Sequence, residues 1–117
     1  MIRRRMAPEG VLVTQSSSPF FARRTFWCIE QTLAAVFPTT HSFQLTVPSF
    51  GVWGFNMARK GGEIPEQFQF DVATRYLDDE VMQAAGVFGR DVAQLESPVN
   101  SIMEPKLYQL YLVDLGQ

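Results

Sequence analysis

The chain is poor in the residues from which metal and cofactor sites are usually built. It contains one cysteine and one histidine, which excludes an internal disulfide framework, a multi-cysteine zinc site and a histidine-rich metal cluster. No glycine-rich nucleotide-binding loop follows a strand-like segment, and His41 has no second ligand at metal-binding spacing. We therefore predict no catalytic residue, no metal site and no cofactor site in these residues.

Long apolar runs and a strong net charge are also missing. No window approaches the roughly 18 apolar residues of a membrane span, and the apolar run at residues 11–13 is too short for a signal-peptide core after Arg3, Arg4 and Arg5. Ten basic and twelve acidic residues give a net charge of -2, so no overall charge recruits nucleic acid or an anionic membrane. We expect a cytoplasmic protein.

The apolar content suffices for one modest domain, because 46% of the 117 residues are hydrophobic and 13% are aromatic. Charge is distributed unevenly: residues 1–60 carry seven basic and two acidic side chains, and residues 61–117 carry three basic and ten acidic ones. The change falls near Gly61 and Gly62, which favour a turn or linker. We predict a single partial domain, with a core at residues 1–60 and an acidic, mostly helical tail at 61–117.

The first half predicts the order strand, helix, strand, strand. Residues 10–15 are typical of a buried strand, and apolar residues recur at helical spacing over 19–36, with Ser18 as the candidate N-cap. Residues 42–47 and 51–58 are typical of strands joined by a connection too short for a crossover helix, so they should pair antiparallel. This order predicts an α/β fold: a parallel strand–helix–strand unit with an antiparallel strand appended.

The second half predicts three short helices, at about residues 74–85, 89–95 and 105–112. The first should start near Asp78, Asp79 and Glu80, whose carboxylates suit a helix N-terminus. The three arginines at residues 3–5 are interpreted as the exposed face of a terminal helix.

Gln15 is the first candidate for a binding role, because it ends the first predicted strand. In an open α/β sheet, the carboxyl ends of parallel strands and a following helix N-terminus face the ligand crevice. An amide there can accept from an amine or donate to a carboxylate. The alternative is a strand-end turn in which Gln15 and the three serines after it satisfy backbone groups.

Phe50 is the second candidate, since it lies in the densest stretch of aromatic residues and glycines, residues 47–55. Its ring could line a pocket where glycines admit a ligand closely; alternatively the stretch is a hairpin turn with core aromatics. Trp27 and Trp53 are interpreted as core residues, and Cys28 as a small buried residue rather than a nucleophile.

These segments together resemble a known family. Residues 11–21, Phe26 with Trp27, and residues 47–55 are similar to the carboxyl-terminal part of spermidine synthases, the polyamine aminopropyltransferases. Residues 74–77 and 84–88, with Val99 and Asn100, resemble the closing segment of the bacterial enzymes. The resemblance covers nearly the whole chain, and its three-part motif is specific as a set.

The resemblance implies a Rossmann-like, class I methyltransferase-type sheet and a role in polyamine biosynthesis. In this family, decarboxylated S-adenosylmethionine donates an aminopropyl group to putrescine, and an acidic residue acts on the attacking amine. That residue and the donor-binding glycine loop lie upstream of the strand that begins here at Gly10. The resemblance therefore implies that this chain alone is catalytically incomplete.

Two substrate-binding positions carry over from the family, Gln15 and Phe50. Gln15 matches the family glutamine at the end of the fifth strand, beside the polyamine. Phe50 stands where many members have a tyrosine that helps to hold the amine, so the hydroxyl is missing here.

An isolated remnant of such a sheet should expose one edge, which predicts a homo-oligomer or pairing with a chain that supplies the missing donor-binding half. Two alternatives to the transferase segment remain at this point. One is a non-catalytic interaction module that binds a partner through the sheet edge. The other is a small enzyme of another class, which the lack of a base-and-nucleophile pair disfavours.

Overall fold

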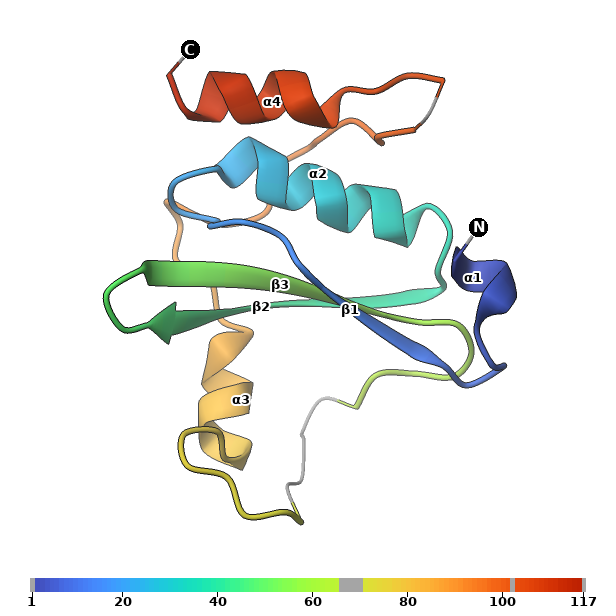
Figure 1. The fold of residues 1–117 in the computed structure, drawn as a ribbon, viewed down its shortest axis with the longest axis vertical. Helices are drawn as coiled ribbons and strands as arrows, with labels where there is room; N and C mark the ends of the chain where they lie inside the picture. Colours follow the sequence, from blue (N-terminus) through green and yellow to red (C-terminus); the bar gives the residue numbers. More distant parts are fainter. Residues whose placement is uncertain (1, 66–70, 102, 117) are drawn as a thin grey trace.

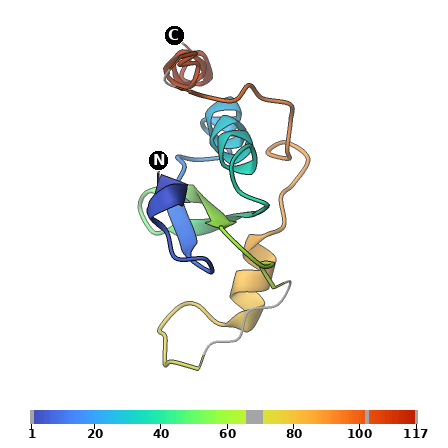
Figure 2. The same cartoon turned by 90° about the vertical axis from the view of Figure 1, so that its right-hand side faces the viewer.

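The structure is a computed structural model that describes residues 2–65, 71–101 and 103–116. Its elements stack in the order α4, α2, sheet and α3, as the views in Figures 1 and 2 show. In chain order they are α1 (Ile2–Arg5), β1 (Val11–Gln15), α2 (Arg23–Ala34), β2 (Thr39–Val47), β3 (Gly51–Arg59), α3 (Asp79–Ala85) and α4 (Leu107–Asp114). Within the described ranges, no helix is long and apolar enough to cross a membrane.

The sheet has three strands in the order β1-β3-β2. Strand β3 pairs antiparallel with both neighbours, so β1 and β2 run in the same direction. The predicted α/β order and the antiparallel pairing of β2 with β3 are confirmed. The placement of the third strand as an appendage was wrong, because β3 lies between the other two, with its Phe55 opposite Gln15 on one side and Phe43 on the other.

Strand β1 is not buried as its apolar sequence predicted. Val11 and Val13 are 54% and 49% exposed, since β1 is at the edge of the sheet and its paired residues in the described chain all belong to β3. Helix α3 packs over the β2 side, around Phe43 and Met82. The face of β1 that carries Val11 and Val13 is therefore less buried by the described residues than its apolar sequence predicts.

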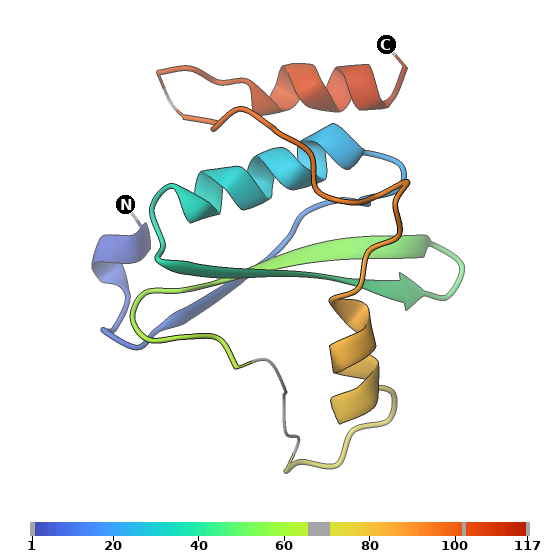
Figure 3. The same cartoon turned by 180° about the vertical axis from the view of Figure 1, so that it is seen from behind.

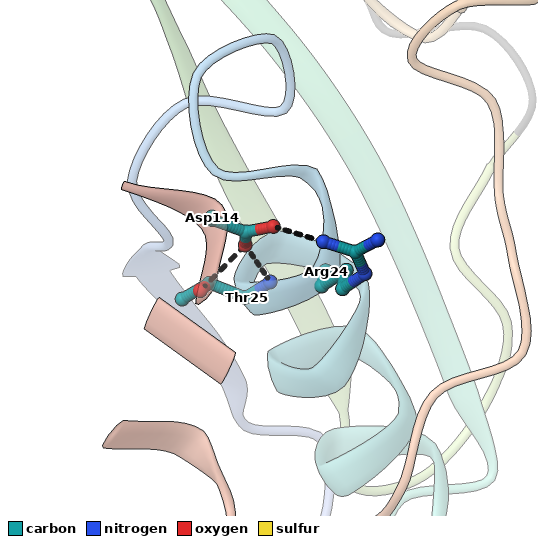
Figure 4. A network of polar contacts seen from close by, with 3 residues as sticks. All are labelled: Arg24, Thr25 and Asp114. Carbon is teal, nitrogen blue, oxygen red and sulfur yellow. Dashed lines mark hydrogen bonds and ion pairs between the residues drawn. The ribbon is translucent and has the colours of Figure 1, made fainter. Parts of the chain in front are cut away.

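Helix α2 begins later than predicted. Ser18 caps a turn rather than the helix, because its Oγ accepts from the backbone N–H groups of Phe20 and Phe21, both at 3.3 Å. The N-terminus of α2 is satisfied from α4: Asp114 Oδ2 accepts from the Thr25 N–H at 2.7 Å and from the Thr25 hydroxyl at 2.8 Å. Figure 4 shows this cluster, in which Arg24 lies 3.6 Å from the other carboxylate oxygen.

The face of α2 toward the sheet and the tail carries the largest buried rings. Phe26 is fully buried and Trp27 is 4% exposed, and their ring centroids lie 4.8 Å apart in an edge-to-face arrangement. Cys28 is also fully buried, as predicted. Trp53, in contrast, is only partly buried on β3.

The tail covers the outside of α2. Helix α3 begins as expected, since Asp78 Oδ1 accepts from the Val81 N–H at 2.7 Å. The helix predicted at residues 89–95 does not form, because this segment is a turn and extended chain bound to α2 by Trp27 Nε1 to Val92 O at 2.9 Å and by Arg23 to Ala93 O. Figure 3 shows the segment running from α3 along α2 to α4. Outside α3 and α4, the described tail residues form turns and extended chain rather than helix.

The short helix α1 carries Arg3, Arg4 and Arg5, all exposed, as predicted for a terminal helix.

Candidate functional site

Gln15 is the last residue of β1 and is exposed. Its cross-strand partner is Phe55, which packs against Phe43 of β2 and Met82 of α3. Directly opposed residues of an antiparallel pair point to the same face, so Gln15 projects on the α3 side of the sheet. It stands there at the open edge, where its amide is accessible to a ligand.

The loop that follows Gln15 is held by the middle strand. The Ser16 N–H donates to Gly54 O at 2.8 Å, and the Gly54 N–H donates to Ser17 O at 2.7 Å. Ser17 has a φ of 65°, a conformation that non-glycine residues adopt rarely and that the surrounding structure must hold. The turn after β1 is therefore a defined structure rather than a loose connection.

Gly54 also sets how closely α2 approaches the sheet. A Cβ atom at this position would lie 2.3 Å from Phe26 Cε2 and 2.9 Å from Pro19 Cδ, distances that no real side chain tolerates. The glycine therefore lets the Phe26 ring lie directly on β3. This contact anchors both the helix and the chain segment that leads from Gln15 into it.

Phe50 lies at the tip of the β2–β3 hairpin and is 71% exposed. The turn is closed by its N–H, which donates to Val47 O at 3.0 Å, and uses positive φ angles at Ser49 and Gly51. Gly51 and Phe55 are four residues apart on an extended strand, which at 3.3 Å per residue is about 13 Å. Gln15 thus lies opposite the middle of β3, whereas Phe50 lies at the hairpin end, so the two residues are not adjacent.

A groove of about 280 Å³ lies on the α3 side, between the hairpin and α3. It is lined by β2, β3, α3 and the segment before α3, and the lining is mostly apolar: Gln44, Leu45, Thr46, Val52, Tyr76, Val81, Ala84 and Ala85. Neither Gln15 nor Phe50 belongs to this lining. The described residues therefore leave both predicted binding positions open to solvent instead of enclosing them in one cavity.

Two titratable groups have shifted pKa values, and both shifts come from burial. Burial lowers the pKa of His41, which lies within β2 rather than before it, with its ring stacked on Phe43 at 6.0 Å. Burial raises the pKa of the Cys28 thiol, and a hydrogen bond with Thr32 opposes this in part. A thiol with a raised pKa is a poor nucleophile, which agrees with a packing role for Cys28.

The described residues provide no assembled metal centre: none of residues 2–65, 71–101 and 103–116 form a group of three or more His, Cys, Asp or Glu placed to hold an ion. A polar cluster beneath the Gln15 turn was not predicted; it is formed by the buried Ser16 and Asn56 and the half-buried Ser42. The signal for it was the side chain of Asn56, which alternation places on the same face as the small residues Gly54 and Ala58.

No family model matches the chain. It is 36% identical over 115 residues to a polyamine aminopropyltransferase of Oceanobacillus iheyensis, covering 95% of this chain and 22% of that protein. It is 40% identical over 111 residues to polyamine aminopropyltransferase 1 of Streptomyces coelicolor, covering 93% of this chain and 21% of that protein. The chain thus spans about a fifth of the length of these curated relatives.

The fold is also similar to that of a solved structure. The spermidine synthase of Thermotoga maritima superposes with a TM-score of 0.56 at 20% identity, covering 93% of this chain and 35% of that one. These matches do not favour an interaction module that merely reuses the fold. The sequence similarity identifies the chain as a carboxyl-terminal part of the spermidine synthase, or polyamine aminopropyltransferase, family, and the fold agrees with it.

Proposed function

We propose that the chain forms the amine-binding end of an aminopropyltransferase, which moves an aminopropyl group from decarboxylated S-adenosylmethionine to a putrescine-like amine. The observation that carries this proposal is the position of Gln15, exposed at the carboxyl end of β1 and followed by a turn bound to Gly54. This is where the family resemblance expects the glutamine beside the polyamine. Sites held by rigid elements orient small substrates well.

Gln15 would bind the amine through its amide oxygen, which accepts a hydrogen bond from an amine N–H. Binding of this kind orients the nitrogen but does not remove its proton. An amine must lose a proton to attack, so the reaction needs a base. The resemblance places that base upstream of β1, and we infer that this chain contributes orientation rather than acid–base chemistry.

Phe50 would supply an apolar wall for the same substrate. Its ring has no hydroxyl, and with 71% of its surface exposed it can contact methylene groups or the face of an ammonium group. The chain therefore offers one hydrogen-bonding contact at the end of β1 and one aromatic contact at the tip of the β2–β3 hairpin. Such a pair suits an aliphatic amine better than an acidic or phosphorylated ligand.

A partner is needed to enclose this site. Strand β1 has an edge that no described strand occupies and exposes Val11 and Val13 on one face. On its other face, Leu12 borders a groove of about 770 Å³ between α1 and α2. We propose that the donor-binding half of the enzyme, in the same or a separate chain, adds to this edge; a second copy of the chain is the alternative. A cytoplasmic location stays a prediction.

The first test is calorimetric titration of the chain with decarboxylated S-adenosylmethionine and with putrescine, followed by an aminopropyl-transfer assay. We expect neither donor binding nor turnover by the chain alone. Turnover should appear when the chain is mixed with the part of the Streptomyces coelicolor relative that it does not match. Donor binding and turnover by the chain alone would contradict the inference that it lacks the donor site.

The second test is Gln15→Ala in the reconstituted enzyme, with Gln109→Ala as the matched control, because Gln109 is an exposed glutamine on α4. Loss of one hydrogen bond should raise the KM for putrescine about tenfold and leave the KM for the donor unchanged. Gln109→Ala should change neither constant. Equal increases in the KM for putrescine and the KM for the donor would contradict an amine-binding role of Gln15.

A further inference from the structure

Asn56 is a fully buried amide to which nothing above assigns a role. It lies in the middle of β3 with 0% of its surface exposed, on the face that α2 covers. Its neighbours on that face, Gly54 and Ala58, are small and also buried. Burying a polar side chain is unfavourable unless its donors and acceptors are satisfied, so the partners of Asn56 indicate what it holds.

Those partners form a relay across all three strands. The Ser42 hydroxyl on β2 donates to Asn56 Oδ1 at 2.6 Å, and Asn56 Nδ2 donates to Ser16 Oγ at 2.9 Å. Ser16 Oγ in turn donates to Thr14 O, at 3.2 Å, on β1. Each group donates once along this line, so the orientation of the amide is determined at both ends.

The relay ends on both sides of Gln15. Ser16 follows Gln15 and Thr14 precedes it, and the Ser16 side chain joins the Thr14 carbonyl to Asn56. The backbone of Ser16 is also bound to Gly54, and the next residue, Ser17, has a positive φ. The direction of the backbone at and after Gln15 therefore depends on the hydrogen bonds that Ser16 makes.

We propose that Asn56 is a positioning residue that sets the orientation of Gln15 toward the amine, acting through Ser16. The identity of the substrate in this inference rests on the proposed function, whereas the link from Asn56 to Gln15 does not. Asn56 lies on the opposite face of the sheet from the Gln15 side chain, so it cannot touch a ligand bound there. Its effect must pass through the backbone of the turn.

The test compares three variants of the 117-residue chain: Asn56→Leu, Ser16→Ala and Ser42→Ala. The first two break the link from Asn56 to Ser16, and Ser16→Ala does so while keeping Asn56 itself. Ser42→Ala is the matched control, since it also removes one hydrogen bond from Asn56 but leaves the link to Ser16. Should Asn56→Leu fail to fold, Ser16→Ala and Ser42→Ala still decide the question.

Three readouts by nuclear magnetic resonance separate positioning from a general loss of stability. We expect Asn56→Leu and Ser16→Ala to accelerate amide exchange at Ser16 and Gly54 about tenfold. We expect the Gln15 side chain to change from one rotamer to an average of several. Putrescine should then need about tenfold higher concentration to shift the Gln15 side-chain amide resonance. Ser42→Ala should lower the unfolding midpoint while changing each readout less than about twofold.

The proposal is overturned if Ser16→Ala leaves the Gln15 rotamer and the exchange rates unchanged, or if Ser42→Ala alters them as strongly. The absence of any putrescine shift at Gln15 in the unmodified chain is a different result. It would count against amine binding, the proposed function, while the rotamer and exchange data would still decide the role of Asn56.

Discussion

Helix α2 and strand β1 both contain several apolar residues, yet the helix is buried far more completely than the strand. The helix lies between the sheet on one side and the tail with α4 on the other, and it buries Phe26, Trp27 and Cys28. The strand pairs along one edge and leaves Val11 and Val13 about half exposed. Apolar sequence therefore indicates what an element needs, whereas burial depends on which other elements are present to cover it.

Helix α2 and strand β1 also differ in the kind of contact that each makes with the rest of the chain. Around α2, polar groups of the tail bind specific atoms of the helix: the Val92 carbonyl accepts from Trp27, and the Asp114 carboxylate accepts from Thr25. Around β1, the uncovered atoms are the apolar side chains and one strand edge. We infer that α2 belongs to the hydrophobic core of this chain, and that β1 is the edge strand to which a further strand can add.

The largest expected effect in this comparison is that of Phe26→Ala. Phe26 is fully buried and contacts Trp27 and the bare backbone of Gly54, so truncation leaves a cavity that the glycine cannot fill. We expect a loss of about 3–5 kcal/mol of unfolding free energy, measured by urea denaturation. Phe20→Ala is the control; Phe20 is 61% exposed, and a change within about 0.5 kcal/mol is expected. A loss for Phe26→Ala as small as the one expected for Phe20→Ala would mean that the Phe26 ring is not part of the core.

A smaller effect is expected from Asp114→Ala, which removes the carboxylate that caps α2 from α4. The Thr25 N–H and hydroxyl lose their acceptor, and loss of a helix cap costs about 0.5–2 kcal/mol. Amide exchange in α4 should accelerate as well, because this cluster attaches it to α2. Arg24→Ala should have less effect, since the Arg24 side chain is 54% exposed and exposed ion pairs contribute little. The opposite ranking would assign the attachment to the ion pair.

The smallest effect is expected from Val13→Thr, which places a hydroxyl on the open face of β1. In the chain alone we expect a change within about 0.5 kcal/mol, because this side chain is already in contact with water. Val92→Thr makes the same chemical change at a residue that is 6% exposed and should cost about 1–3 kcal/mol. A large loss for Val13→Thr in the isolated chain would show that β1 is covered, for example by a second copy.

Local sequence signals predicted most helices and strands but not which of them lie side by side in the fold. Alternating apolar residues and the glycines near Phe50 were enough for the β2–β3 hairpin, since its pairing needs only a short connection. Asp78 marked the start of α3 for the same local reason. The insertion of β3 between β1 and β2 was not predictable in this way, because strand order depends on contacts between residues about 40 positions apart.

The candidate site divides along the same line. Gln15 and Phe50 followed from position and resemblance, whereas Asn56 emerged only when Ser16 and Ser42 were seen beside it. Alternation places Asn56 on the same face of β3 as Gly54 and Ala58, but it does not reveal the partners of Asn56, which come from β2 and from the turn after β1.

The sequence by itself determined the class of the fold, the presence and order of the main helix and strands, and the family, because these depend on short-range patterns of apolar and turn residues. The tertiary structure alone decided that β3 is central, that residues 89–95 form a turn and irregular chain instead of a helix, and that Val11 and Val13 of β1 are left about half exposed. The physical reason is that hydrogen-bond partners and buried surface belong to pairs of segments. Trp27 and Arg23 hold the 89–95 segment through its carbonyl groups, and every peptide presents such groups whatever its side chain.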